Sequence, residues 1–227
     1  MMKFYAAVGT YRIRKEKGWD SPYIQKLGKL HPISLPEFVI WTTLLWDVLS
    51  YDELKQLYQV QTSGIPGITA DFDDLLDMLV DRKLIVCGQG YTGVEALGNM
   101  LSDAFVVPYK TSKTKMFAKR LQMWWKGSIS TDNLLTAKNT VDLDQNERTV
   151  LQLTRCTPLS TAELAYCFEH GIKRFRNPKD IITVLYDQDD VDQVTLSAAM
   201  ANSERRNDVL TAVSNLYLKR RILFETA

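Results

Sequence analysis

The sequence predicts a mainly helical α+β protein with small β-hairpins, built from two similar units in tandem. The first observation is that the segments Ser34 to Val60 and Asp144 to His170 lie 110 positions apart and share one pattern. The second is that each segment contains two helix-start signals at the same offset. The third is the length, because 227 residues suffice for two units of about 100 residues each.

Four capping boxes mark the expected helix starts. In a capping box, a small polar side chain accepts a hydrogen bond from a backbone N–H of the first turn, and a Glu three residues later accepts one from the backbone of the capping residue. The first helices are expected after Ser34 and Asp144 and the second helices after Ser50 and Ser160, each with Glu at the required position. Apolar residues at matching inward positions are Leu49 and Leu159, Leu54 and Leu164, and Tyr58 and Phe168. The two units are therefore expected to bury the same faces.

The first unit is expected to contain three helices and a hairpin. Alternating aromatic and β-branched residues over 3–14 predict a strand, and a polar connection follows it over 15–32. Helices are expected at about 35–46, after Ser50 and at about 70–82, with a break at 63–67. The segments 84–87, 88–90 and 91–92 then predict a strand, a glycine turn and a returning strand.

The second unit repeats the first two helices and then departs from the first by an insertion over 171–202. A last helix is expected from Ser203 to about Arg221, followed by the apolar residues 222–224. The predicted division is an N-terminal module at 1–100, a basic, aromatic helical linker at 101–141 and a C-terminal module at 142–227. For the linker residues 113–126, a helix packed between the modules is favoured over a membrane surface or a nucleic-acid surface.

Several of these segments resemble the winged helix-turn-helix superfamily. The resemblance rests on Ser50 to Tyr58, on Asp71 to Gly93 with the ending Leu79 to Ile85, and on the counterparts in the second copy. It implies two winged-helix modules in tandem. Most winged-helix proteins bind duplex DNA with the third helix in the major groove and the wing against the backbone, so the resemblance implies a DNA-binding protein that regulates transcription.

The third helix of the first unit is acidic. Asp73, Asp77 and Asp81 recur at a spacing of four and are expected to form a stripe on one helix face. DNA would repel these carboxylates, so readout of bases by this helix is not expected. Two interpretations stay open: a solvated face whose first aspartates favour the helix N-terminus, or a docking surface for a basic protein or peptide partner.

The last helix of the second unit predicts a DNA contact instead, because Asn and Arg side chains bind base edges and Lys and Arg bind phosphates. The candidate DNA-binding residues are Lys173, Arg174, Arg176, Arg205, Arg206, Asn207, Thr211, Asn215, Lys219, Arg220 and Arg221. A structural alternative stays open. In that alternative, Lys219 to Arg221 favour the negative helix C-terminus and Arg205 and Arg206 are surface charge.

Catalytic and cofactor motifs are not expected. The stretch Gly88 to Gly93 matches a dinucleotide fingerprint, but the acidic residue that such a site needs about 20 positions later is missing. A turn explains these glycines better. Neither His31 nor His170 has a second ligand at metal-binding spacing. The sequence therefore predicts a non-enzymatic protein without a cofactor or a metal site.

The composition predicts a cytoplasmic protein. The chain has three cysteines among apolar neighbours, which indicates reduced core thiols. It has no signal-peptide pattern and no apolar run of the roughly 18 residues that a membrane span needs. The net charge is +1, so any attraction to DNA must be local. The predicted function is a regulator that binds duplex DNA through its C-terminal module, with a protein- or peptide-binding adaptor as the alternative.

Overall fold

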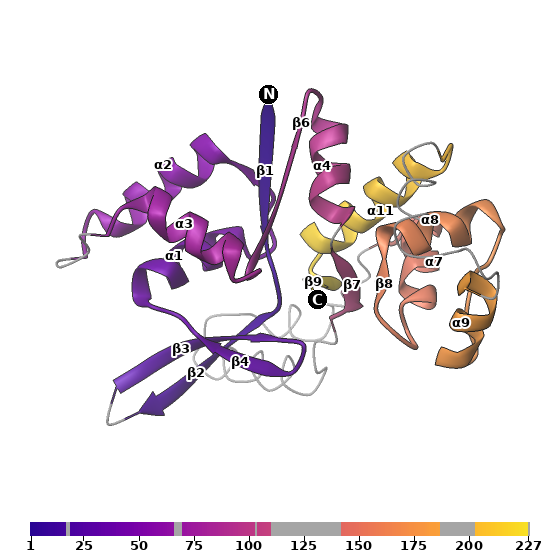
Figure 1. The fold of residues 1–227 in the computed structure, drawn as a ribbon, viewed down its shortest axis with the longest axis horizontal. Helices are drawn as coiled ribbons and strands as arrows, with labels where there is room; N and C mark the ends of the chain where they lie inside the picture. Colours follow the sequence, from indigo (N-terminus) through magenta and orange to yellow (C-terminus); the bar gives the residue numbers. More distant parts are fainter. Residues whose placement is uncertain (17–18, 66–69, 103, 110–141, 187–202, 227) are drawn as a thin grey trace, which may run out of the picture.

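The computed structural model describes residues 1–16, 19–65, 70–102, 104–109, 142–186 and 203–226. Over these residues the chain forms eight helices and three antiparallel sheets of three strands each (Figure 1). The α+β class predicted from the sequence is confirmed. The greater part of the predicted linker, 110–141, and the part of the predicted insertion at 187–202 lie outside the described residues.

The N-terminal unit is a sheet of order β5-β1-β6 with three helices on one face. Its elements are β1 (Met2–Ala7), α1 (Leu35–Leu44), β5 (Leu49–Ser50), α2 (Tyr51–Thr62), α3 (Phe72–Asp81) and β6 (Ile85–Gly90). Both predicted capping boxes form. The Ser34 hydroxyl accepts from the backbone of Glu37 and the Ser50 hydroxyl accepts from that of Glu53, and each carboxylate accepts from the backbone of its serine. Helices α1 and α2 therefore begin where the sequence predicts.

The C-terminal unit repeats this order of elements, and its sheet has the equivalent order β8-β7-β9. Its elements are β7 (Phe105–Pro108), α7 (Gln145–Leu153), β8 (Leu159–Ser160), α8 (Thr161–Glu169), α11 (Arg206–Leu218) and β9 (Ile222–Glu225). One further helix, α9 (Pro178–Tyr186), lies in the predicted insertion. Strand β7 falls inside the range predicted as a helical linker. It is extended because it pairs with both β8 and β9, and Val106 is fully buried in the core.

The prediction of a returning strand at Tyr91–Thr92 is wrong. The antiparallel partner of β6 is the leading strand β1, so no returning strand is needed to complete the sheet. After Gly90 the chain enters helix α4 (Gly93–Ser102). The Thr92 hydroxyl accepts from the Glu95 backbone at 3.1 Å, and the Glu95 carboxylate accepts from the Tyr91 backbone at 2.8 Å. This local capping fixes the start of α4 close to the end of β6.

The strand expected over 3–14 is two strands. The chain bends at Gly9, whose φ is +80° and where a Cβ atom would lie 2.4 Å from the Gln25 carbonyl oxygen. Beyond the bend, β2 (Thr10–Glu16), β3 (Trp19–Lys26) and β4 (Lys29–Pro32) form the third sheet, in the order β2-β3-β4. The predicted polar connection is therefore largely β-structure, and its β2–β3 hairpin extends away from the helices (Figure 1).

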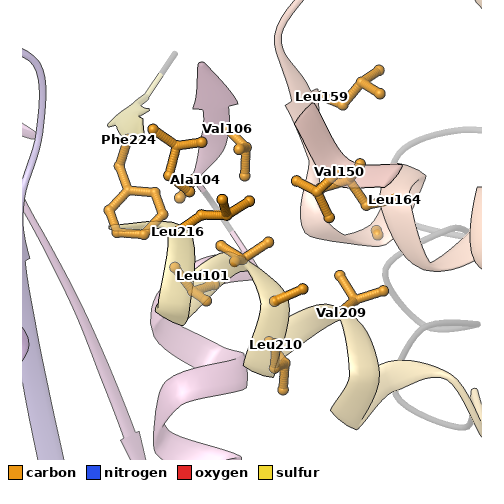
Figure 2. Close-up of a cluster of buried hydrophobic side chains, with 14 of the residues drawn as sticks. Leu101, Ala104, Val106, Val150, Leu159, Leu164, Val209, Leu210, Leu216 and Phe224 are labelled. Atoms are coloured by element: carbon orange, nitrogen blue, oxygen red, sulfur yellow. The ribbon is translucent and has the colours of Figure 1, made fainter. Parts of the chain in front are cut away.

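Strand β1 separates two hydrophobic cores. Tyr5 and Ala7 belong to the core formed with α1, α2 and α3, whereas Ala6 and Val8 belong to the core formed with α4, α11 and the C-terminal unit. Figure 1 shows α1 to α3 on one side of β1 and β6 and α4 and α11 on the other. Figure 2 shows how α4, β7, α7, α8, α11 and β9 contribute apolar side chains to the second core. The two units are thus packed into one body.

A buried ion pair occurs at equivalent places in the two units. The capping-box Glu37 is 4% exposed and pairs with Arg82 just after α3, with an Nη1–Oε1 distance of 2.8 Å. Glu147 is 1% exposed and pairs with Lys219 just after α11, with an Nζ–Oε1 distance of 2.6 Å. Each pair joins the start of the first helix of a unit to the end of its third, so the repeat extends to the charged residues.

We expect Lys219→Met to lower the free energy of unfolding by about 3 kcal/mol, because it leaves the buried Glu147 carboxylate without its cation. Adding Glu147→Gln should recover part of this loss, since the buried charge is then removed. Chemical denaturation monitored by circular dichroism measures both effects. The exposed Lys179→Met should change stability by no more than about 0.5 kcal/mol. Equal stability of Lys219→Met and the wild type would contradict the proposed role of the pair.

Candidate nucleic-acid interface

Helix α11 and the residues that flank it carry most of the predicted DNA-binding residues, and α11 is the most central helix of the C-terminal unit. It packs against α4, α7, α8 and β9. Six of its residues are buried: Val209, Leu210, Ala212, Val213, Leu216 and Tyr217. The exposed residues Asn207, Thr211 and Leu218 recur at helical spacing and form one narrow stripe, with the half-buried Asn215 beside it. This stripe is therefore the part of α11 that is open to a groove of duplex DNA.

The cations at the two ends of α11 have different surroundings. At the start, Arg205 is exposed and pairs with Asp208 at 3.0 Å, whereas Arg206 is half-buried against α4. A Cβ atom at Gly98 of α4 would lie 2.4 Å from the Arg206 Nη2 atom, so the guanidinium occupies the space that this glycine leaves. Arg206 thus contributes to the packing of α11 on α4.

At the end of α11, the Lys219 ammonium binds other residues of the protein. Its ammonium donates to both carboxylate oxygens of Glu147 and to the backbone oxygen of Asp142. Arg220 is exposed with a φ of +57°, and Arg221 is half-buried. Of the three predicted basic residues at this end, Arg220 is therefore the one whose side chain faces solvent.

The loop between α8 and α9 presents three further predicted cations, Lys173, Arg174 and Arg176, all exposed. Phe175 between them is buried and anchors the loop, and its carbonyl oxygen lies 3.5 Å from the Cys156 sulfur. The Asp180 carboxylate accepts from the backbone of Arg176 at 3.0 Å and caps the loop end. The loop therefore holds its positive side chains on an anchored backbone.

The carboxylates predicted as an acidic stripe on α3 have different surroundings in the structure. Asp73 turns toward α2, where it accepts hydrogen bonds from the Tyr51 hydroxyl and the Lys55 ammonium, and both interactions hold the pKa of Asp73 below its usual value. Asp74, Asp77 and Asp81 are exposed and lie at helical spacing, with the 51% exposed Met78 among them. The exposed carboxylates of α3 thus include Asp74 beside Asp77 and Asp81, while Asp73, whose side chain is 49% exposed, is paired with residues of α2.

A group of exposed cations that was not selected from the sequence lies on the β2–β3 hairpin. Arg12 and Arg14 occupy alternate positions of β2, and Lys15 follows them. Alternation in a strand places Arg12 and Arg14 on the same face. The alternation of the two arginines is visible in the sequence and could have identified this group. Only the structure shows that they lie on an exposed hairpin.

The glycine-rich stretch between β6 and α4 serves close packing rather than phosphate binding. A Cβ atom on Gly88 would lie 2.1 Å from the Met100 backbone nitrogen, and one on Gly90 would lie 2.5 Å from the Ala96 backbone nitrogen. Side chains at these positions would collide with the backbone of α4. The first-turn backbone N–H of Glu95 already donates to the Thr92 hydroxyl, so the helix start supplies one fewer free donor for an anion.

Other reactive groups in the described ranges are buried or isolated. Burial and the nearby Glu163 carboxylate raise the pKa of the Cys167 thiol to about 12, so this cysteine stays a neutral thiol at ordinary pH. Within the part of the chain that the structure describes, no group of three or more His, Cys, Asp or Glu side chains is arranged to hold a metal ion. Among the helices of these residues, none has both the length and the apolar composition to cross a membrane.

Comparison of the chain with protein-family models, with curated proteins and with solved structures finds no match. The function of these surfaces therefore has to follow from their own chemistry. They are the exposed cations, the α11 stripe and the acidic face of α3.

We expect Gly88→Ala to lower the free energy of unfolding by about 3 kcal/mol, because the added methyl group forces α4 away from β6. Gly64→Ala is the matched control. A Cβ atom there has no neighbour within 4 Å, so stability should change by no more than about 0.5 kcal/mol. Thermal and chemical unfolding measure both variants. If Gly88→Ala is as stable as Gly64→Ala, the close-packing role of Gly88 is wrong.

Cys167 should resist thiol reagents in the folded protein. In a Cys87→Ser/Cys156→Ser variant, Cys167 is the remaining thiol, and its pKa of about 12 together with complete burial predicts negligible alkylation by iodoacetamide at pH 8. Unfolding in guanidinium chloride should make the same thiol react fully. Mass spectrometry after timed quenching follows both reactions. Equal alkylation rates with and without denaturant would show that Cys167 is accessible in the native state.

Proposed function

We propose that this protein is a non-enzymatic regulator built from two winged-helix modules in tandem, and that its C-terminal module binds duplex DNA. The observation that carries the proposal is the exposed stripe of α11. Asn207 and Thr211 lie on it, Arg205 lies at its start and Arg220 at its end. Asn and Thr side chains bind base edges and arginines bind phosphates, which is the division of labour that DNA readout requires.

The repeated order of elements supports the winged-helix part of the proposal. Apart from α9 in the insertion of the second unit, each unit has a helix, a short strand, two further helices and a strand, and the short strand and the last strand belong to one sheet. The central strand of that sheet is the leading strand, β1 or β7, which takes the place of a returning wing strand. On this proposal the third helices are α3 and α11.

The surroundings of the side chains reduce the predicted set of DNA contacts. Arg206 is engaged in packing against α4 and Lys219 in the ion pair with Glu147. The exposed residues that we propose for DNA binding are Lys173, Arg174, Arg176, Arg205, Asn207, Thr211 and Arg220. The half-buried Asn215 and Arg221 have smaller exposed surfaces and are expected to contribute less.

A protein- or peptide-binding adaptor is the second candidate function, and the exposed face of α3 favours it. Met78 is half exposed between the carboxylates of Asp74, Asp77 and Asp81. An apolar contact surrounded by negative charge complements a partner that carries an apolar side chain among basic residues. The same charges repel DNA, so this face and the C-terminal module are expected to serve different ligands.

Binding to DNA should weaken steeply with salt, because neutralised phosphates release their counterions. We expect the triple variant Lys173→Gln/Arg174→Gln/Arg176→Gln to reduce the slope of log K against log salt by about 3, since each lost phosphate contact removes about 0.9. Fluorescence anisotropy with a labelled random duplex measures the slope. Arg148→Gln, an exposed charge change on α7, should leave the slope unchanged. Absence of binding at low salt would overturn the DNA proposal and favour the adaptor.

A further inference from the structure

We propose that the β2–β3 hairpin is a second phosphate-binding surface for duplex DNA, separate from the C-terminal module. The proposal rests on the proposed function, since it assumes that duplex DNA is the ligand. It assigns the phosphate contacts to Arg12 and Arg14, which lie on one face of β2.

The two faces of the hairpin are chemically distinct. Register pairs Thr10 with Gln25, Arg12 with Tyr23, Arg14 with Ser21 and Glu16 with Trp19, so these residues share one largely polar face. The Glu16 carboxylate on this face accepts a hydrogen bond from the Tyr23 hydroxyl. Register also pairs Tyr11 with Ile24 and Ile13 with Pro22 on the other, apolar face. The arginines therefore lie together, on the face that does not pack against α1.

Contacts along the polar face hold the arginine side chains in place. The Arg12 Nε atom donates to the Gln25 side-chain oxygen at 3.0 Å, and the Arg14 guanidinium carbon lies 5.8 Å from the centre of the Tyr23 ring. A guanidinium has five N–H donors, so these contacts leave several for phosphate oxygens. Positions two apart in a strand are separated by about 6.8 Å, which spaces the two cations along a backbone rather than at one phosphate.

Charge is strongly segregated in the N-terminal half of the chain. Residues 10–32 contain six Lys or Arg and two Asp or Glu, although the whole chain has a net charge of +1. Residues 47–81 contain eight Asp or Glu and one Lys. A polyanion is therefore attracted to the hairpin and repelled from α2 and α3, which orients it on the N-terminal unit.

The base of the hairpin is fixed to the body while its outer part is free. Ile24 is fully buried, and the Tyr11 ring lies edge-on to Phe38 at 5.6 Å and to Trp41 at 6.2 Å between ring centres. The Leu27 backbone donates to the Glu225 carboxylate at 2.9 Å, so the neighbouring turn is attached to the C-terminal strand. Figure 1 shows the hairpin extending beyond the helices.

This shape favours a duplex over other polyanions. The major groove of DNA is about 12 Å wide and admits a two-stranded β-ribbon. A hairpin that is already held in its extended form loses little conformational freedom on binding, so more of the electrostatic attraction contributes to affinity. Charged residues on an edge strand also discourage strand pairing between molecules, but that role does not require both arginines to lie on one face.

The decisive comparison uses the full chain and a labelled 20-base-pair random duplex, with anisotropy titrations at 50–200 mM KCl. Arg12→Gln/Arg14→Gln should reduce the slope of log K against log salt by about 2 and weaken binding at 50 mM on the order of a hundredfold. Lys173→Gln/Arg174→Gln/Arg176→Gln reports on the C-terminal module in parallel, and Arg148→Gln is the control. Circular dichroism verifies folding, which these exposed substitutions should not disturb.

The outcomes separate the two proposals. Loss of slope with the hairpin variant supports the hairpin surface, whatever the C-terminal variant does. An unchanged hairpin variant with a weakened C-terminal variant overturns the hairpin surface and leaves the proposed function standing. No binding by the wild type overturns both. Co-sedimentation with phosphatidylserine vesicles that depends on Arg12 and Arg14, without an effect of these residues on DNA binding, would assign the hairpin to a membrane surface and overturn the proposal.

Discussion

The alternation of side chains along β1 is the constraint on which the rest of the structure depends. Successive residues of a strand point to opposite faces, so Tyr5 and Ala7 enter one core while Ala6 and Val8 enter the other. All four are at most 2% exposed, so the end of β1 and the residue after it are closed to solvent on both faces. At the junction, the buried Tyr217 hydroxyl donates to the Leu44 carbonyl and accepts from the Trp46 backbone. The two units therefore cannot separate without exposing both cores.

The ion pairs at equivalent places show that the two units share a buried charged contact as well as a hydrophobic pattern. In each unit the capping glutamate of the first helix is buried and has two tasks, because it caps its helix and binds the cation after the third helix. A buried carboxylate requires such a partner. The cation is Arg82 in the first unit and Lys219 in the second, but in both units it directly follows the third helix.

The third helices of the two units differ in the charge of their exposed faces. Helix α3 exposes carboxylates, whereas α11 exposes Asn207 and Thr211 between cations and the β2–β3 hairpin adds Arg12 and Arg14. With a net charge of +1, the protein has no general attraction to a polyanion, so contact depends on where these charges lie. Our proposals place duplex DNA on the basic surfaces and leave the acidic face of α3 to water or to a basic partner.

The sequence by itself determined the α+β class and the four capped helix starts, because capping is local chemistry within four residues. It also identified the acidic face of α3, but not that Asp73 on this helix pairs with Tyr51 and Lys55 of α2. Only the tertiary structure decided the rest. Pairing of β6 with β1 and of β7 with β9 joins residues far apart in the chain, and it replaced the predicted hairpin return. Whether Lys219, Arg206 or Arg12 faces solvent likewise depends on long-range packing, so the spacing of charges in the sequence could not determine which of them is free to bind a ligand.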